Sequence, residues 1–233
     1  MKTKILYEDQ ALLVIHKPAG IAVQSARVGQ MDVESELRNY LSAEARKTAK
    51  GGSSNPYIGL VHRLDQPVEG LLVVAKTKDA TAKLNKQLTS GSLNKKYLAV
   101  VSVESDQAED AGTFMDYMIK DGQVARIVSS NVAEAKEARL HYKLLKKADN
   151  IALADIEIET GRFHQIRCQM AHHGMPLLGD AKYGSSQSAA LSQNLGIRNV
   201  ALCANRIDFK HPVTDKVMGF EVEPANPAFG KFL

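Results

Sequence analysis

The chain has few of the features that mark secreted, membrane or cysteine-dependent proteins. It has two cysteines among 233 residues, Cys168 and Cys203, and no Cys-x-x-Cys pair, which excludes a disulfide framework and a cysteine zinc site. The longest purely apolar runs, such as residues 71–75, are far too short to cross a bilayer. Glu8 and Asp9 interrupt the apolar residues near the N-terminus, so a signal peptide is not indicated. We therefore expect a cytoplasmic protein without membrane contact.

Several enzyme signatures are also missing. The sequence contains no Gly-x-x-x-x-Gly-Lys, Gly-x-Gly-x-x-Gly, Gly-x-Ser-x-Gly or His-Glu-x-x-His segment, which disfavours nucleotide hydrolysis, dinucleotide redox chemistry and elbow-serine hydrolysis. His164, His172 and His173 lie close together in sequence, but no cysteine or carboxylate follows at ligand spacing. We therefore predict no metal site.

The composition is that of a folded globular protein. Apolar residues make up 44% and charged residues 24%, which disfavours a disordered or fibrous chain. Thirty Lys and Arg against 26 Asp and Glu leave a net charge of +4, which is compatible with a polyanionic partner but does not require one. The length suits one large domain or two small ones, and we expect a single domain over residues 1–233.

Short apolar runs between turn residues predict many strands and few helices. An opening hairpin is expected from residues 5–7 and 12–15, closed by a turn that contains Pro18 and Gly20. The remaining predicted strands are 57–61, 71–75, 97–103, 124–128, 138–145, 151–158, 200–204 and 217–222. Helices are expected from an Asp32 cap to about residue 47, over 78–90 and over 163–173, and loops over 50–56 and 184–196. Because strands and helices do not alternate, we predict an α+β fold with a mixed, mostly antiparallel sheet and flanking helices and loops.

A charged segment, His62-Arg63-Leu64-Asp65, lies between two predicted buried strands. Polar side chains at the end of a buried strand stand where a functional site can form. The structural alternative is that Asp65 caps the turn and Arg63 pairs with it on the surface, since Asp favours turns. The residues of this segment alone leave both interpretations open.

A second segment, Gly161-Arg162-Phe163-His164-Gln165-Ile166-Arg167, stands where a strand ends and a helix is expected to begin. Backbone amides at that point, together with Arg162 and Arg167, could hold an anion or orient a carboxylate. An ordinary basic helix is the alternative.

The two segments and their neighbours together resemble the pseudouridine synthases of the RluA family. The matching segments are HRLDQPVEGLLVVAK at 62–76, KKYLAV at 95–100, GRFHQIR at 161–167 and AHHGMPLLGDAKYG at 171–184. The opening ILYEDQALLVIHKPAGIAV at 5–23 is similar to the family's first hairpin. The resemblance covers nearly the whole chain in the family's order.

This resemblance implies an RNA pseudouridine synthase, an isomerase that uses neither a metal nor an organic cofactor. By similarity, Asp65 is the essential carboxylate, acting as a nucleophile or as a base at the sugar, and Arg167 pairs with it to favour its ionised form. Tyr97 is expected to pack on the uracil ring, although a core strand tyrosine is the alternative. Arg63 fills the space of the flipped-out uridine. The remaining residues expected at the RNA are His62, Arg162, His164 and Gln165.

The sequence departs from the family pattern at residues 66–69, where many members end in Thr-Ser and this chain has Gln-Pro-Val-Glu. Glu69 is expected to add a negative charge near the RNA. The pair Asp65 and Glu69 also suggests a glycosidase or base-releasing enzyme, because two carboxylates are the equipment for glycosyl hydrolysis. Nothing beyond that pair supports this alternative.

Basic residues give weaker, independent support for RNA binding. They recur over residues 78–96 and 136–147, although solvated helix and strand faces would show the same pattern. The expected partner is ribosomal or transfer RNA, not DNA, and we expect a monomer of the short family form, without an N-terminal S4 domain. A non-catalytic RNA-binding or ribosome-assembly protein of the same fold is the second hypothesis.

Overall fold

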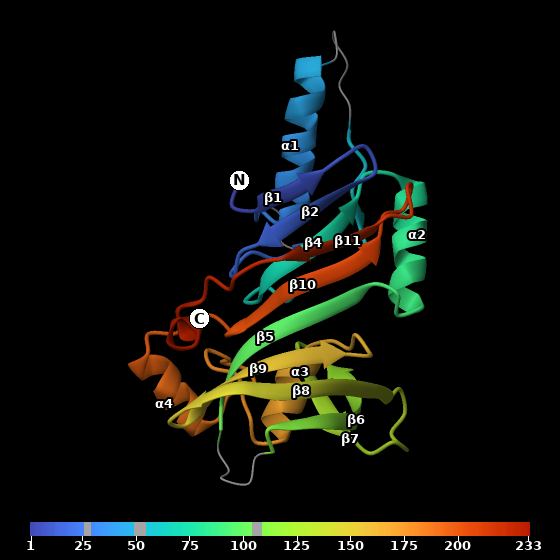
Figure 1. The fold of residues 1–233 in the computed structure, drawn as a ribbon. Coiled ribbons are helices and arrows are strands. Elements are labelled where there is room, and N and C mark those ends of the chain that lie inside the picture. Colours follow the sequence, from blue (N-terminus) through green and yellow to red (C-terminus); the bar gives the residue numbers. More distant parts are fainter. Residues whose placement is uncertain (26–28, 49–54, 104–108) are drawn as a thin grey trace. The chain divides into compact units, whose positions relative to one another are not determined.

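The computed structural model describes residues 1–25, 29–48, 55–103 and 109–233 (Figure 1). These residues form two compact units. The first contains residues 1–94 and 206–222, and the second contains residues 95–205 and 223–233. Each unit is described by itself below.

The first unit is built on a long buried strand, β4 (Glu69–Ala75). The hairpin of β1 (Lys4–Glu8) and β2 (Leu12–Lys17) joins it through antiparallel pairing of β2 with β4, and β3 (Gly59–Leu60) also pairs with β4. β11 (Val217–Glu221) pairs with residues 206–210 of β10 (Leu202–Lys210). The predicted hairpin is confirmed, and the strand predicted at 57–61 is shortened to two residues.

Two helices accompany these strands. α1 (Val33–Thr48) begins where predicted, because Asp32 accepts a hydrogen bond at Oδ1 from the amide of Ser35 at 2.8 Å. α2 (Lys78–Thr89) is capped by Thr77 and packs Ala80 and Leu84 into the core of this unit. Most of the predicted loop 50–56 lies outside the described residues.

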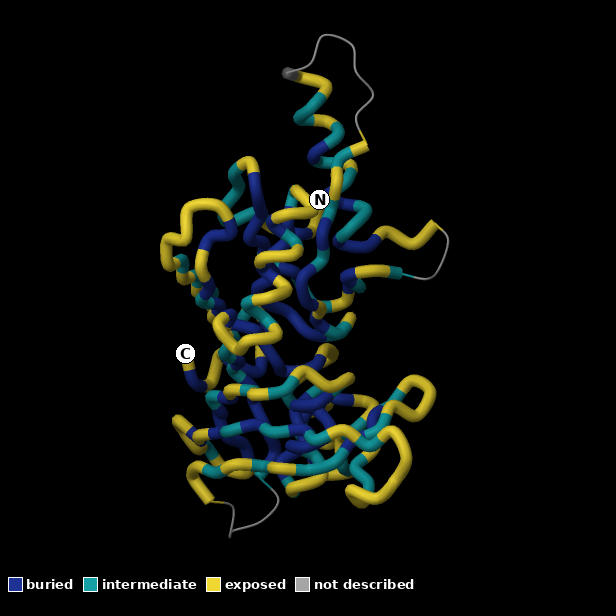
Figure 2. Tube along the Cα trace, turned by 90° about the vertical axis from the view of Figure 1, so that its right-hand side faces the viewer, coloured by how far each residue is buried: buried dark blue, intermediate teal, exposed yellow. Residues whose placement is uncertain are grey.

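The second unit is a five-stranded antiparallel sheet. Its order is β5 (Asn94–Ser102), β9 (Ile151–Ile158), β8 (Lys136–Ala148), β6 (Ala111–Asp121) and β7 (Val124–Val128). α3 (Gln165–His172) packs Cys168 against Met118, Ala125 and Ala138 of β6, β7 and β8. α4 (Ser186–Asn194) and a short 3₁₀ helix (Pro227–Lys231) complete the unit. Figure 2 shows that buried segments gather in the interior of each unit and exposed ones on its outer turns.

Three predictions about the second unit are wrong. Strand β6 was not predicted, because Met118 is its one buried residue and Gly112 and Asp116 break its apolar pattern. α3 begins two residues later than predicted, since His164 adopts a left-handed backbone with φ of 52° that interrupts the helix. The segment 184–196, predicted as a loop, contains α4.

α4 begins with a reciprocal pair of hydrogen bonds. The Ser185 hydroxyl accepts from the amide of Ser188, and the Ser188 hydroxyl accepts from the amide of Ser185, at 3.0 and 2.9 Å. These two hydrogen bonds satisfy two backbone amides at the start of the helix. The serines that predicted a loop therefore specify the beginning of a helix.

Replacing Ser185 by alanine is therefore expected to lower the free energy of unfolding by about 1 kcal/mol. Urea denaturation of Ser185→Ala beside Ser186→Ala, whose side chain is exposed one residue later, measures this. Equal stabilities of the two variants would contradict a capping role for Ser185.

Both cysteines are buried and neither is in a disulfide, and burial raises the pKa of the Cys168 thiol to about 11. Among the described residues, no helix has the length and apolar character that a membrane span requires.

Candidate active site

The segment 62–65 forms the connection between β3 and β4 in the first unit. Leu64 and Val68 are buried and anchor it, and the amide of Val68 donates to the carbonyl oxygen of Asp65 at 3.1 Å, which closes a tight turn. Asp65 is half-buried and Arg63 is exposed. The loop therefore fixes the backbone of Asp65 while the Arg63 side chain extends to solvent.

His62, by contrast, is part of the packing. It is 8% exposed, and its Nε2 accepts a hydrogen bond from the amide of Val73 on β4 at 3.2 Å. An accepting Nε2 assigns the proton of the neutral ring to Nδ1. The structure shows His62 anchoring the loop, and its contact with RNA stays a prediction.

Lys17, at the end of β2, ties the turn after the first hairpin to the Asp65 loop. Its side chain is fully buried, and its ammonium donates to the carbonyl oxygens of Pro18, Ile21 and Gln66 at 3.0, 2.8 and 3.2 Å. The amide of Gly20 also donates to Gln66 O at 2.8 Å. The residue directly after Asp65 is thus held from two sides, a role that the sequence did not reveal.

The ammonium of Lys17 lies in the field of two carboxylates. Burial lowers its pKa to about 8, and the negative charges of Asp65 and Glu69 oppose that lowering. Lys17 therefore places a positive charge near Asp65 below pH 8.

This burial predicts a pH dependence of unfolding. The ordinary pKa of lysine, 10.5, applies to the unfolded chain, whereas in the folded protein the pKa of Lys17 is about 8. Between these values the unfolded chain binds more protons, so the free energy of unfolding rises with pH, by roughly 1.4 kcal/mol per unit of pKa difference. We expect wild type to gain stability relative to Lys17→Met from about pH 8 to 10.5.

Urea denaturation across this window measures the difference between the two proteins. Lys216→Met, at an exposed lysine of the same unit, is the matched control and should follow the wild-type curve. Parallel curves for wild type and Lys17→Met would contradict the lowered pKa.

Glu69 does not present its charge to solvent. It is buried, and its Oε2 lies 3.9 Å from Nε2 of His16 on the paired strand β2. Burial lowers the pKa of His16, and the charge of Glu69 opposes this effect. The carboxylate of Glu69 therefore faces the interior near His16 and Lys17, and its effect on RNA binding stays a prediction.

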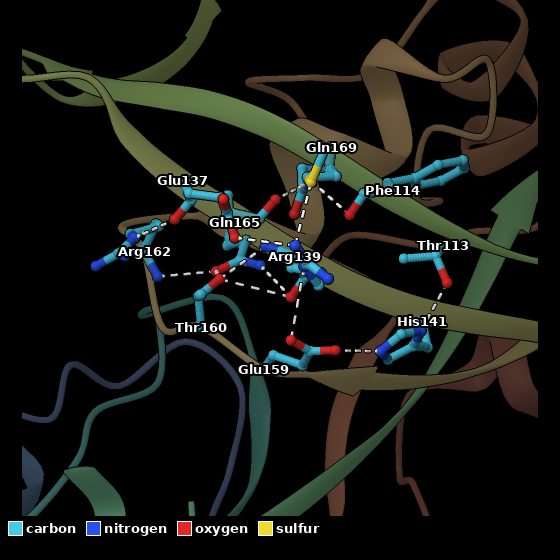
Figure 3. A network of polar contacts seen from close by, with 12 residues as sticks. Thr113, Phe114, Glu137, Arg139, His141, Glu159, Thr160, Arg162, Gln165 and Gln169 are labelled. Carbon is cyan, nitrogen blue, oxygen red and sulfur yellow. Dashed lines mark hydrogen bonds and ion pairs between the residues drawn. The ribbon is translucent and has the colours of Figure 1, made fainter. Parts of the chain in front are cut away.

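In the second unit, the Gln165 side chain hydrogen-bonds the loop that precedes α3 (Figure 3). Its Oε1 accepts from the hydroxyl of Thr160 at 2.8 Å and from the amide of Arg162 at 3.0 Å, and its Nε2 donates to Arg139 O at 3.1 Å. The side chain is buried. Gln165 thus shapes the loop that carries Arg162, and an RNA contact for it stays a prediction.

Arg162 and His164 stand on that loop. Arg162 is exposed and its Nε donates to Glu137 O at 2.7 Å, as Figure 3 shows. His164 is half-buried, with Nδ1 at 2.8 Å from the hydroxyl of Tyr183. Because that hydroxyl accepts from the amide of Ala125 at 2.6 Å, it can donate its proton to His164.

Arg167, one turn further along α3, forms a bidentate ion pair with Asp180. Nε and Nη2 donate to Oδ2 and Oδ1 at 2.7 and 2.8 Å, and the two side chains are 3% and 0% exposed. Oδ1 of Asp180 also accepts from the amides of Lys182 and Tyr183, and the Tyr183 ring centroid lies 5.2 Å from the guanidinium carbon. The guanidinium is therefore rigidly oriented and charge-compensated.

Asp180 is a residue that the sequence analysis did not single out. The glycine directly before it is the feature of the sequence that could have indicated this residue. Gly179 has φ of +73°, and a Cβ there would lie 2.1 Å from the carbonyl oxygen of Asn199. Only glycine fits this turn, which delivers the carboxylate to Arg167. The pairing of Arg167 with Asp65 stays a prediction.

Tyr97 lies on β5, opposite Ile156 of β9, and is 5% exposed. The predicted site residues are divided between the two units. The first unit carries His62, Arg63 and Asp65. The second unit carries Tyr97, Arg162, His164, Gln165 and Arg167.

The basic stripe on β8 is balanced by acidic residues of neighbouring segments. Nη2 of Arg139 lies 3.3 Å from Oε1 of Glu137, and Nε of Arg139 lies 3.6 Å from Oε2 of Glu159. Oε1 of Glu159 also lies 2.7 Å from Nε2 of His141 (Figure 3). Lys147 likewise pairs with Asp110. This stripe therefore offers less positive charge to RNA than its sequence suggests.

One cluster in the described part of the chain has metal-ligand chemistry. Asp116 on β6 and the two histidines at the end of α3, His172 and His173, bring ligand atoms within 4.8 Å of one another. Asp116 also accepts from Gln169 at 2.7 Å and hydrogen-bonds His173 at 3.1 Å. The carboxylate comes from a strand more than 50 residues away, so spacing in the sequence could not indicate it. That the protein uses no metal stays a prediction.

Comparison with known proteins identifies the family. Residues 11–172 match the RNA pseudouridylate synthase family. Ribosomal large subunit pseudouridine synthase D of Zymomonas mobilis is 37% identical over 224 residues, which are 94% of this chain and 68% of that protein. The RNA pseudouridine synthase YlyB of Bacillus subtilis is 34% identical over 95% of this chain and 69% of its own length. The chain belongs to the RNA pseudouridylate synthase family and is an isomerase of that class.

Solved structures agree on the fold. Human RNA pseudouridylate synthase domain containing 4 superimposes with a TM-score of 0.76, covering 98% of this chain and 92% of that one at 22% identity. Human RNA pseudouridylate synthase domain containing 1 gives 0.72, covering 95% and 83% at 18% identity. The predicted α+β class and the predicted family are confirmed. The chain spans between 61% and 69% of the length of the curated relatives in Zymomonas mobilis, Nitrosomonas europaea, Bacillus subtilis and Pseudomonas aeruginosa.

Proposed function

We propose that this chain isomerises specific uridines of large-subunit ribosomal RNA to pseudouridine. The observation that carries the substrate class is the naming of its relatives. The synthases D of Zymomonas mobilis and of Pseudomonas aeruginosa, 37% and 36% identical, both carry ribosomal large subunit names. Transfer RNA is the second proposed substrate class, and only the resemblance of the sequence to the family supports it.

We further propose that Asp65 is the essential carboxylate. The reaction breaks the bond between uracil N1 and ribose C1′ and forms a bond between C5 and C1′. The proton lost from C5 is balanced by a proton gained at N1, so substrate and product are isomers. A carboxylate can act as nucleophile at C1′ or as base at the sugar. The closed turn at Val68 and the buried Lys17 ammonium support this role, because they hold the carbonyl oxygens of Asp65 and of Gln66, the residue that follows it.

Tyr97 and Arg167 are proposed as the other two catalytic residues. Arg167 would favour the ionised form of Asp65, and its orientation by Asp180 suits a group that acts through position and charge. Tyr97 would pack on the uracil ring. Arg63, exposed on the Asp65 loop, is proposed to occupy the space left by the flipped uridine, because a guanidinium plane can stack on neighbouring bases. His62, Arg162, His164 and Gln165 are proposed to line the RNA-binding surface.

We propose that the two units act as one catalytic domain, as a monomer in the cytoplasm, with RNA as the partner and no cofactor. The family reaction is an isomerisation that consumes no oxidant, reductant or group donor. It therefore sets no requirement for a cofactor.

The test is pseudouridine mapping by carbodiimide treatment and primer extension. Ribosomal and transfer RNA from a source that lacks this protein is incubated with wild type or with Asp65→Asn. A new stop in large-subunit RNA with wild type alone is the expected result and identifies the uridine. A stop confined to transfer RNA would overturn the substrate class. Salt-sensitive RNA binding without any new stop would favour a non-catalytic RNA-binding protein.

A further inference from the structure

Phe163 is an exposed aromatic side chain next to predicted RNA-binding residues. It is 36% exposed and stands between Arg162 and His164 on the loop that enters α3. The left-handed backbone of His164 ends the loop there, so Phe163 precedes the helix and does not pack beneath it. Burial of an aromatic ring is favourable, so a bound partner that covers the exposed part of Phe163 would be stabilised by the contact.

The ring of Phe163 is held in place from below. It stacks on the imidazole of His164 with centroids 3.8 Å apart and planes 21° apart. His164 is in turn fixed by the Tyr183 hydroxyl, which is held by the amide of Ala125. An aromatic ring ordered in this way loses little conformational freedom when a planar partner stacks on it.

The surroundings of this ring are cationic. Nζ of Lys120, at the end of β6, lies 5.1 Å from the Phe163 centroid. Arg162 directly precedes Phe163 and is exposed. Lys182 is also exposed, it precedes the tyrosine whose hydroxyl contacts His164, and its ammonium donates to Gln123 O in the β6–β7 turn. The acidic residue of that turn, Asp121, pairs with Arg126 at 3.1 Å.

We infer that Phe163 is a stacking platform for an unpaired base of the RNA substrate, with Lys120 contacting the phosphate of the same nucleotide. An exposed aromatic ring beside flexible cations is the arrangement that single-stranded nucleic acid uses, because every base has a π face and every nucleotide carries a negative charge. The incoming base replaces the ammonium over the ring, and the ammonium moves to the phosphate. The inference rests on the proposed function, since it extends the RNA-binding surface of that enzyme by one nucleotide.

The first test measures binding of short single-stranded oligouridine to full-length variants in the Asp65→Asn background, which prevents turnover. Phe163→Ala is expected to weaken binding roughly 5- to 100-fold, with an unchanged dependence on salt. Val213→Ala, which trims an exposed apolar side chain of the first unit, is the matched control and should bind like its parent. A duplex RNA probe should not distinguish Phe163→Ala from its parent, because its bases are already stacked.

Lys120→Gln tests the phosphate contact. It is expected to reduce the slope of log affinity against log salt by about 0.7, since one phosphate contact of a single strand is lost. Lys216→Gln, an exposed lysine elsewhere, should leave the slope unchanged.

A direct readout of stacking is available because the chain contains no tryptophan. Phe163→Trp introduces a single indole whose fluorescence a stacked base should quench on addition of oligouridine. Unchanged affinity of Phe163→Ala together with unquenched fluorescence of Phe163→Trp would overturn the platform. Pseudouridine mapping with wild type remains a separate readout, so failure of the platform and failure of the proposed function are distinguishable.

Discussion

Replacement of Asp65 by asparagine is expected to abolish pseudouridine formation, with a loss of at least about 10⁴-fold in turnover. The amide has nearly the shape of the carboxylate, but it is a poor nucleophile and a poor base. The measurement is single-turnover conversion of large-subunit ribosomal RNA, with pseudouridine quantified after nuclease digestion.

The backbone of the loop that carries Asp65 is held by the buried side chains of Leu64 and Val68 and by the hydrogen bond from the Lys17 ammonium to Gln66 O. The substitution removes one of the two negative charges that favour the buried Lys17 ammonium, so we expect a folded protein whose free energy of unfolding falls by about 1 kcal/mol at neutral pH. Asp215→Asn, at an exposed aspartate of the same unit, is the matched control and should retain full activity. Turnover by Asp65→Asn close to that of wild type would refute its role as the essential carboxylate.

Asp180→Asn is expected to have the second-largest effect. Loss of the buried negative charge leaves the Arg167 guanidinium without its bidentate partner, which should lower the free energy of unfolding by about 3 kcal/mol. The proposed role of Arg167 beside Asp65 predicts that its misplacement also lowers the turnover of folded protein by about 10- to 100-fold, with RNA affinity nearly unchanged. Urea denaturation, binding and single-turnover assays separate the three quantities.

A double variant separates stability from chemistry at this pair. Arg167→Met with Asp180→Asn removes both charges and keeps a side-chain oxygen for the amides of Lys182 and Tyr183, so it should recover most of the stability that Asp180→Asn alone loses, because no buried charge is left unpaired. It should nevertheless stay inactive, since no guanidinium remains. Activity in the double variant would show that Arg167 has only a structural role.

The elements that could be predicted from the sequence have strong local signals. Strands β7 and β9 and helix α2 have apolar periodicity or clear caps, and they begin and end within one residue of the expected positions. β6 lacks such a signal, because its stability comes from pairing with β7 and β8 and not from its own apolar residues. α4 was hidden because serine favours both loops and helix starts, and the reciprocal Ser185–Ser188 bonds appear only in three dimensions.

The candidate site shows the same division. Motif resemblance singles out Asp65 and Arg167 as candidate site residues, because the family pattern implies a role for each. Lys17 and Asp180 also stand inside segments that match the family, but their roles depend on which carbonyls and guanidinium the fold brings to them. The Lys17 ammonium reaches a carbonyl 49 residues away, and Asp180 lies 13 residues beyond its partner. Local patterns do not encode such pairings.

Cys168 gives the protein a built-in reporter of local opening. It directly follows Arg167 on α3, it is buried, and its pKa of about 11 leaves almost no thiolate at neutral pH. A thiol reagent can therefore react with it appreciably only when the helix opens. The labelling rate, calibrated against an unfolded-chain reference, converts into the opening free energy of the segment that carries the arginine. Bound RNA that tightens this helix should slow the labelling without any engineered probe.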